Sequence, residues 1–531
     1  MEHTRLTQVL LVQLYGSLQP PNWEPFSCEV LASALEKHCD YCQAEIMVVN
    51  PLLDSEAELK VIDAISNGQY DLVGLSVPQA TRQTALSILS ALEERLPPTK
   101  RPLIVLGNAL PTNLPESFLK LYPWTVVVKG WGEDALVSLV RMLQHKDAMT
   151  LANIPSVAYI QDGEMQTTTL SYRIVPEKPK RYHLGQYFPC VETSRGCHYG
   201  RCTFCLRPPG RKDYWSRIPL ETILASVREL KEAGITYFTF VDEDFIGNDP
   251  DGALAIALGL RQIGGMNFSF SVRAHKFHRP RAPALVNAKR LETFKALYDA
   301  GLRFVFIGLE SLSNSQLKRY GKGNSVEAGL QAVQMVKSLG ITVEAGFITF
   351  DPFVTLQELH EISSNLRTFG IWENVDHLYQ HMRVQKNTPY EKMLANKGML
   401  KEFDLDMLSY EWDYPDPIIS AIAKACIGWE DQIIPVYIQA RNLYRTKRDF
   451  APAQRFIREI RYLNFKVLEE LINRVSRNEV VVGKPVPVHP HLHERGHQLA
   501  RELQKVINVL PAKEDAENLL LTELENFLSN C

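Results

Sequence analysis

The chain has 531 residues, a length that divides into about three or four ordinary domains. Its hydrophobic content of 45% and charged content of 22% are typical of a globular protein. The formal net charge of −3 excludes a strong electrostatic pull toward nucleic acid or an anionic membrane, and we expect neither as a partner. No apolar run approaches the roughly 20 residues of a membrane helix. The N-terminus also lacks the basic region of a signal peptide, so we expect a cytoplasmic protein.

Short apolar runs alternate with helical patterns through residues 1–150, which we take as the first domain. The runs are residues 6–14, 45–52, 71–77, 102–107 and 124–130. Apolar strands that alternate with helices predict a doubly wound parallel α/β sheet, which binds ligands beyond the carboxyl ends of its strands. The residues after the first strand contain neither a G-x-G-x-x-G motif nor paired acids. We therefore expect neither a standard nucleotide nor a phosphoryl acceptor, and a scaffold without a ligand remains an alternative.

A second alternating series begins at residue 186, after a linker or hairpin at residues 151–185. Its expected strands are residues 186–194, 236–245, 268–274, 302–311, 342–350 and 375–384. Six strand–helix units suit an open, partial (β/α)6 barrel over residues 186–400 better than a closed eight-stranded one. The polar residues at the strand ends should surround one mouth; they are the cysteine loop, Asp242, Glu243, Asp244, Arg273 and Glu310.

Three of the nine cysteines stand close together in TSRGCHYGRCTFC, residues 193–205. Structural zinc commonly takes four ligands in two pairs, and no second pair follows Cys202 and Cys205. A disulfide is disfavoured in a reducing compartment. A [4Fe–4S] cluster on Cys197, Cys202 and Cys205 would leave one iron open for a non-protein ligand. We favour the cluster and keep structural zinc as the alternative.

These motifs resemble those of cobalamin-dependent radical S-adenosylmethionine (SAM) enzymes. DLVGLSV, PLIVLGNALPT, TVVVKGWGEDALVSLV and IPSVAYIQDGEM are similar to the cobalamin-binding domain. The cysteine loop, FVDEDF, SVRA, FIGLESLSNSQLKRYGKG and AGFITFDPFVT are similar to the catalytic barrel, and the resemblance covers about residues 5–395. The cysteine spacing C-x4-C-x2-C is one residue longer than the family's usual C-x3-C-x2-C. The first loop also lacks the Asp-x-His-x-x-Gly signature, which implies cobalamin with no histidine below the metal.

The resemblance implies a role for each matching residue. Cys197, Cys202 and Cys205 would ligate the cluster, and Phe204 would lie near the adenine of SAM. Arg273 and Glu310 would contact SAM, and so would Asp242 and Glu243. The cobalamin would be lined by Gly107, Thr112, Gly130, Gly132 and Glu133, with Asn108 standing where many relatives have glycine. The structural alternatives are that Glu310 caps the following helix and that Arg273 pairs with the acids of VDEDF.

The activity that this resemblance implies is methyl transfer to an unactivated carbon of a natural product, peptide or tetrapyrrole. The reduced cluster would cleave SAM to a 5′-deoxyadenosyl radical, which would abstract hydrogen, and methylcobalamin would deliver the methyl group. An electron donor such as flavodoxin or ferredoxin would be a partner. Cyclisation or rearrangement without methyl transfer is the nearest alternative, and a non-catalytic corrinoid or iron–sulfur sensor is the alternative of another class.

The rest of the sequence predicts structure more than chemistry. Residues 401–531 are expected to form a helical C-terminal domain, either as solvated amphipathic helices or as a cover over the barrel mouth. We expect four other cysteines to be buried structural thiols; they are Cys28, Cys39, Cys42 and Cys190. The Pro-flanked histidines at 489, 491, 493 and 497 are not assigned to a metal.

Overall fold

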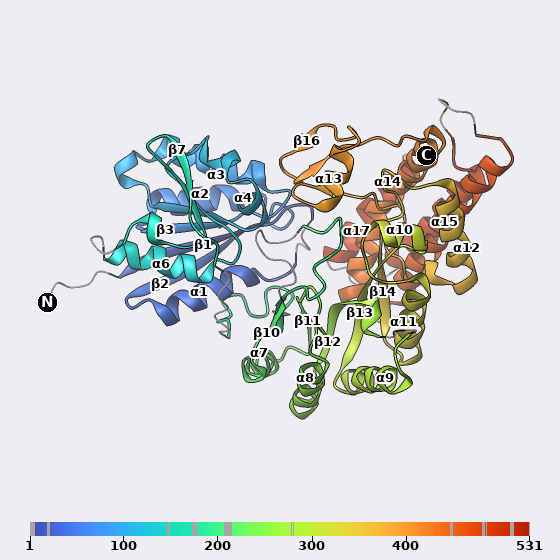
Figure 1. Cartoon of the computed structure of the whole chain (residues 1–531), viewed down its shortest axis with the longest axis horizontal. Helices are drawn as coiled ribbons and strands as arrows, with labels where there is room; N and C mark the ends of the chain where they lie inside the picture. Colours follow the sequence, from blue (N-terminus) through green and yellow to red (C-terminus); the bar gives the residue numbers. More distant parts are fainter. Residues whose placement is uncertain are drawn as a thin grey trace.

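The computed structural model contains two α/β units and a helical C-terminal region (Figure 1). It describes residues 6–18, 22–145, 149–171, 178–206, 215–277, 279, 281–446, 450–480, 484, 486–509 and 515–529. No helix within these ranges is long and apolar enough to cross a membrane. The predicted α/β fold with a parallel sheet and a helical C-terminal region is confirmed.

The N-terminal unit is a seven-stranded sheet in the order β2-β1-β3-β4-β5-β6-β7. The first five strands of this order are parallel and match the apolar runs: β2 (Cys42–Val49), β1 (Thr7–Leu14), β3 (Leu72–Ser76), β4 (Leu103–Gly107) and β5 (Val126–Val128). An antiparallel extension consists of β6 (Val157–Gln161) and β7 (Glu164–Thr167). Both faces are buried, since these strands have few polar residues to present to water.

Helices cover both faces of this sheet (Figure 1). One core includes side chains of α1 (Phe26–His38) and α6 (Glu133–Gln144). The opposite core includes side chains of α2 (Ala57–Asn67), α3 (Arg82–Arg95), α4 (Ala109–Asn113) and α5 (Glu116–Leu119). Two short 3₁₀ turns, η1 (Pro98–Lys100) and η2 (Leu151–Asn153), complete the unit. The carboxyl ends of its parallel strands therefore remain available for a ligand.

The second unit contains a five-stranded parallel sheet in the order β14-β13-β12-β11-β8. Its strands are β8 (Cys190–Val191), β11 (Tyr237–Phe240), β12 (Asn267–Arg273), β13 (Leu302–Glu310) and β14 (Thr342–Phe347), and beside them β9 (Ser194–Gly196) pairs with β10 (Trp215–Arg217). The connecting helices and turns are α7 (Leu220–Glu232), α8 (Pro250–Ile263), η3 (Ala274–Lys276), α9 (Ala284–Asp299), α10 (Asn314–Arg319), α11 (Val326–Ser338), α12 (Leu356–Phe369) and η4 (Ile371–Asn374). Each parallel strand thus brings its carboxyl end to the same edge.

The sixth predicted strand, residues 375–384, is reduced to single bridges. Val375 bridges Ala345 and His381 bridges Phe350, but no continuous ladder forms. The chain between the bridges is bonded to the C-terminal helices instead, because Tyr379 donates its hydroxyl to the carbonyl of Asn464. The sheet is therefore open along this side.

Residues after the barrel form a small sheet and four long helices. The sheet has the order β15 (Val384–Gln385), β17 (Ser409–Tyr410) and β16 (Phe403–Asp404), beside α13 (Pro389–Ala395). It lies between the N-terminal unit and the C-terminal helices in Figure 1. The helices are α14 (Pro417–Thr446), α15 (Ala451–Ser476), α16 (Pro490–Asn508) and α17 (Asp515–Ser529). They share one hydrophobic core with the barrel, so they cover its open side rather than standing apart.

A buried ion cluster fixes this helical cover to the last strand. Arg441 of α14 pairs with Glu344 of β14 at 3.1 Å and with Asp376. Arg461 of α15 donates to Asp376 at 3.0 Å and to the hydroxyl of Tyr437 at 2.8 Å. Burial raises the pKa of Asp376, but the two arginines outweigh it and hold that pKa well below its ordinary value. Asp376 remains ionised because the cover supplies its counter-charges.

We predict that Arg461→Met destabilises the protein by about 3–5 kcal/mol, because the buried Asp376 loses one of the two arginines that neutralise its charge. Arg458→Met is the matched control, since Arg458 lies on the same helix but is 66% exposed in its pair with Glu373. That change should cost no more than about 1 kcal/mol. Thermal unfolding followed by circular dichroism measures both; equal losses for the two variants would contradict the assignment.

Candidate active site

The cysteine loop follows β9 and is held against the end of α10. Thr203 donates its backbone N–H to the carbonyl of Tyr320 at 2.8 Å and its hydroxyl to the carbonyl of Arg319 at 3.0 Å. The hydroxyl of Tyr199 donates to the carbonyl of Gly321 at 2.6 Å. Gly321 has a φ of +60°, and a Cβ there would lie 2.8 Å from the carbonyl of Arg201. A glycine is therefore needed where α10 ends against the loop.

The three thiols differ in exposure. Cys197 and Cys202 are half-buried and Cys205 is exposed. Burial raises the pKa of Cys202, and the positive charges of Lys322 and Arg273 oppose that rise. Within the described ranges, no three His, Cys, Asp or Glu side chains are arranged as a ready metal site. The donor set of three thiols beside two cations still suits an anionic iron–sulfur cluster better than zinc.

Arg273 and Glu310 end neighbouring strands beside this loop. The guanidinium of Arg273 lies 3.7 Å from the ring centroid of Tyr199 and donates to the carbonyl of Lys322 at 2.8 Å. Its Nε is buried without a hydrogen-bond partner among the described residues. Glu310 accepts a 2.6 Å hydrogen bond from Lys322 Nζ and has a φ of +67° at a bulge of β13. Glu310 does not cap the next helix, whose N-cap is Ser313.

The acids of FVDEDF have three different environments. Asp242 is buried, and its carboxylate accepts bonds from the backbone and hydroxyls of Thr193 and Ser194. Burial raises the pKa of Asp242 to about 6, although the hydrogen bonds from Ser194 and Thr193 act to lower it. Glu243 is exposed. Asp244 is fully buried with both carboxylate oxygens unpartnered among the described residues, and Lys276 Nζ lies 3.8 Å away. Asp242 thus anchors the strand before the cysteine loop, whereas the buried Asp244 faces Lys276 without a hydrogen bond among the described residues.

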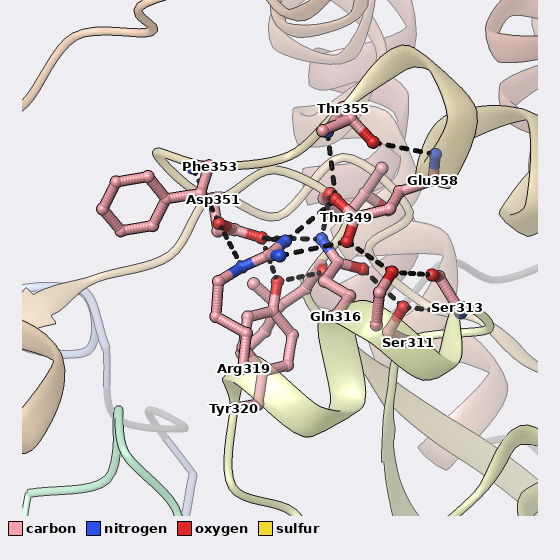
Figure 2. Close-up of polar contacts among 12 residues, drawn as sticks. Ser311, Ser313, Gln316, Arg319, Tyr320, Thr349, Asp351, Phe353, Thr355 and Glu358 are labelled. Carbon is pink, nitrogen blue, oxygen red and sulfur yellow. Dashed lines mark hydrogen bonds and ion pairs between the residues drawn. The ribbon is translucent and has the colours of Figure 1, made fainter.

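Phe204 and α10 are supported by a polar network shown in Figure 2. Arg319 donates to Asp351 at 2.8 Å and to Glu358 at 2.9 Å, and the hydroxyl of Tyr320 donates to Asp351 at 2.9 Å. Phe204 packs edge-on against Tyr320 with 5.7 Å between ring centroids. The network therefore fixes the two carbonyls that hold the cysteine loop.

The strand ends of the N-terminal unit carry the other predicted residues. Thr112 accepts a 3.1 Å bond from the N–H of Gly130, which joins the loops after β4 and β5. A Cβ on Gly107 would meet no atom within 4 Å, so the space above this strand end is open. Asn108 has a φ of +78° and donates to Ser76 Oγ at 3.0 Å. A Cβ on Gly132 would lie 3.1 Å from Leu31. An open strand end bounded by small residues fits a large planar cofactor.

Glu133, predicted to line this ligand site, pairs with Arg195 of β9. Arg195 also donates to Glu192 at 2.9 Å and lies over the ring of Trp131 at 5.3 Å. Burial lowers the pKa of Arg195, but its two carboxylate partners produce a net rise. This contact joins the two units directly. No local pattern predicts this contact, because Arg195 is an ordinary basic residue before the cysteines.

Part of the inner face of the barrel sheet is exposed. Phe306 on β13 is 37% exposed, although its neighbours Val305 and Ile307 on the other face are completely buried. A separate hollow of about 840 Å³ lies between α10, α11 and α12, and none of the predicted site residues lines it. The open inner face is therefore the better candidate for a substrate site.

Comparison with known proteins agrees with this division of the chain. The B12 binding domain family matches residues 20–140, and the radical SAM superfamily matches residues 191–365. The chain is 26% identical to the 4′-phospho-dehydrooxetanocin synthase of Priestia megaterium, over 93% of this chain and 75% of that protein. The structure of the cobalamin-dependent SAM radical enzyme OxsB aligns with a TM-score of 0.84 at 23% identity, over 100% of this chain and 85% of that one. The radical SAM methyltransferase TsrM from Kitasatospora setae gives 0.60 at 15% identity, over 73% and 75%.

We predict that Arg195→Leu destabilises the protein more at pH 8 than at pH 5. Burial raises the pKa of Glu192 from 4.5 to about 7, and Arg195 opposes that rise. Between pH 4.5 and about pH 7, Glu192 is therefore protonated more fully in the folded state than in the unfolded state. The contribution of Glu192 to the free energy of unfolding falls as the pH rises through this range. Without Arg195 the pKa of Glu192 rises further and the loss grows.

Differential scanning calorimetry at the two pH values checks this, with Arg195→Lys as the charge-retaining control. A loss of the same size at both pH values would show that Arg195 does not lower the pKa of Glu192 in the folded protein.

Proposed function

Because the chain belongs to the cobalamin-dependent radical SAM enzymes, we propose that it is a C-methyltransferase that acts on an unactivated carbon of a small molecule or peptide. One observation carries the proposal: Arg195 binds Glu133 across the two units, beside Cys197 on one side and the open strand ends on the other. Two cofactors placed on these units would face one substrate. This is the arrangement that a shared reaction at one carbon requires.

We assign the cofactors as follows. Cys197, Cys202 and Cys205 would hold a [4Fe–4S] cluster, whose formation would draw the three thiols of one short loop together. Arg273, Glu310 and Phe204 would contact SAM, as would an acid of FVDEDF. For that acid we favour Asp244, which faces Lys276 but makes no hydrogen bond among the described residues, over Asp242, whose carboxylate already accepts several hydrogen bonds, and the exposed Glu243. Gly107, Thr112, Gly130 and Gly132 would line cobalamin, with Glu133 acting through Arg195.

When bound, the cluster and SAM supply one-electron chemistry that removes a hydrogen atom from carbon, and cobalamin supplies a methyl group. The protein's own residues prepare the site for this. Lys322 and Arg273 place positive charge beside the thiolates, and the Lys322–Glu310 pair fixes the end of β13. The C-terminal helices cover the open side of the barrel and limit the access of water. An electron donor such as flavodoxin or ferredoxin would serve as partner.

A second candidate is a rearrangement or cyclisation without methyl transfer. The similarity to the phospho-dehydrooxetanocin synthase favours it, since it spans 93% of this chain and extends beyond the two family domains. Both candidates use the same cofactors and the same residues to hold them. They differ in whether a methyl group leaves SAM during the reaction.

We predict that Cys197→Ala, Cys202→Ala and Cys205→Ala each lower iron and sulfide content sharply after anaerobic reconstitution, and that the triple variant binds none. Cys42→Ala is the matched control, since Cys42 is a half-buried thiol of the N-terminal unit. Iron and sulfide analysis with the absorption spectrum measures the result. Zinc in place of iron in the wild-type protein, or a full cluster in the triple variant, would refute the cluster assignment.

The products of turnover separate the two candidate functions. Methyl transfer predicts S-adenosylhomocysteine together with 5′-deoxyadenosine and a substrate that gains 14 mass units, whereas rearrangement predicts 5′-deoxyadenosine alone. Chromatography with mass detection on the reconstituted enzyme measures these products. Failure to cleave SAM under reducing conditions would contradict both functions and favour a sensor.

A further inference from the structure

A cationic side chain without a counter-charge lies where the barrel meets the N-terminal unit. Residues 381–386 run from the barrel mouth toward that unit. At the start of this segment the N–H of Met382 donates to the carbonyl of Phe350 at 2.7 Å, just beyond the end of β14. At its other end Lys386 pairs with Glu116 of α5 at 3.4 Å. Arg383 lies between these two contacts.

The side chains of this segment alternate between two environments. Met382 and Val384 are buried in an apolar cluster with Tyr320 and Tyr390. The side chains between and beside them are the half-buried His381 and the exposed Arg383. Because neighbours along an extended chain point to opposite sides, Arg383 points away from that cluster. It therefore projects from the junction of the two units rather than into the protein core.

His381, two residues before Arg383, contacts aromatic and polar groups. It stacks on Trp412 with 5.9 Å between ring centroids, and the hydroxyl of Tyr414 lies 2.8 Å from His381 Nδ1. Burial lowers the pKa of His381 to about 4, so this ring is neutral at physiological pH and contributes no positive charge. Of these two side chains, Arg383 alone therefore carries a positive charge.

Arg383 differs from several other arginines of this region. Arg195, Arg319, Arg441 and Arg461 each bind at least one carboxylate. Arg383, by contrast, makes no hydrogen bond, ion pair or ring contact with any residue that the structure describes, although it is exposed. Burial by surrounding groups lowers its pKa, with no acid to offset this. A guanidinium that is accessible, partly desolvated and not paired with an acid is suited to bind an anion.

We propose that Arg383 binds an oxyanion of the substrate, a phosphate or a carboxylate, at the junction between the barrel mouth and the N-terminal unit. The assignment of this anion to the substrate rests on the proposed function, whereas the anion site itself does not. A guanidinium forms two parallel hydrogen bonds with either group, which would fix one end of the substrate. The substrate class is thereby narrowed to acidic small molecules or acidic peptides.

Site-specific labelling tests the anion site without turnover. Phenylglyoxal reacts with accessible guanidiniums, and peptide mass spectrometry of the full-length protein reports the rate at each arginine. We expect Arg383 to react faster than Arg228, which is exposed but paired with Glu221 at 2.6 Å. Inorganic phosphate or acetate should slow labelling at Arg383 and leave Arg228 unchanged. The anion that protects better identifies the group. Labelling at Arg383 that neither anion slows would overturn the proposal.

A binding measurement gives the second test. The affinity of the full-length protein for the protecting anion, measured by NMR titration, should fall at least about tenfold in Arg383→Ala, because a charge-assisted hydrogen bond is lost. Arg383→Lys should retain part of it, and Arg228→Ala all of it. Equal affinity in Arg383→Ala and wild type would also overturn the proposal. Since neither test requires SAM cleavage, failure of the enzymatic function would leave the outcome readable.

Discussion

Arg195 is the residue on which the arrangement of the site depends, because it places one buried positive charge between carboxylates from two separate folds. Glu133 begins α6 of the N-terminal unit, and Glu192 directly follows β8, the first strand of the barrel. A buried ion pair adds little to stability compared with apolar packing, but a buried charge without its partner is very costly. Other placements of the two units would leave Glu133 buried without Arg195, so this ion pair favours the observed placement.

The cysteine loop is positioned by carbonyls at and just after the end of α10. These carbonyls accept hydrogen bonds from the backbone N–H and hydroxyl of Thr203 and from the hydroxyl of Tyr199. The helix α10 is itself fixed by Arg319 through Asp351 and Glu358 (Figure 2). Because Thr203 lies between Cys202 and Cys205, these contacts fix the part of the loop that carries the second and third cysteines.

The parallel strands and the location of the strand-end residues were predictable, because buried parallel strands form continuous apolar runs between helical patterns. The sixth barrel strand was not, since residues 375–384 show a strand pattern yet bond to helices encoded much later in the chain. The acids of FVDEDF show a second limit. Adjacent carboxylates look alike in sequence. In the folded protein, Asp242 accepts hydrogen bonds from Thr193 and Ser194, whereas Asp244 accepts none from the described residues. The Arg195 contact joins distant segments and has no local pattern.

The ion cluster of the helical cover also bears on how the chain matures. Glu344 and Asp376 leave the ribosome well before Arg441 and Arg461, which are the cations that neutralise them. Until those arginines are present, burying the two carboxylates would cost free energy, so this edge of the barrel stays exposed to water. The ion cluster can therefore form only after α14 and α15 have been synthesised, so this edge of the barrel is completed late in folding.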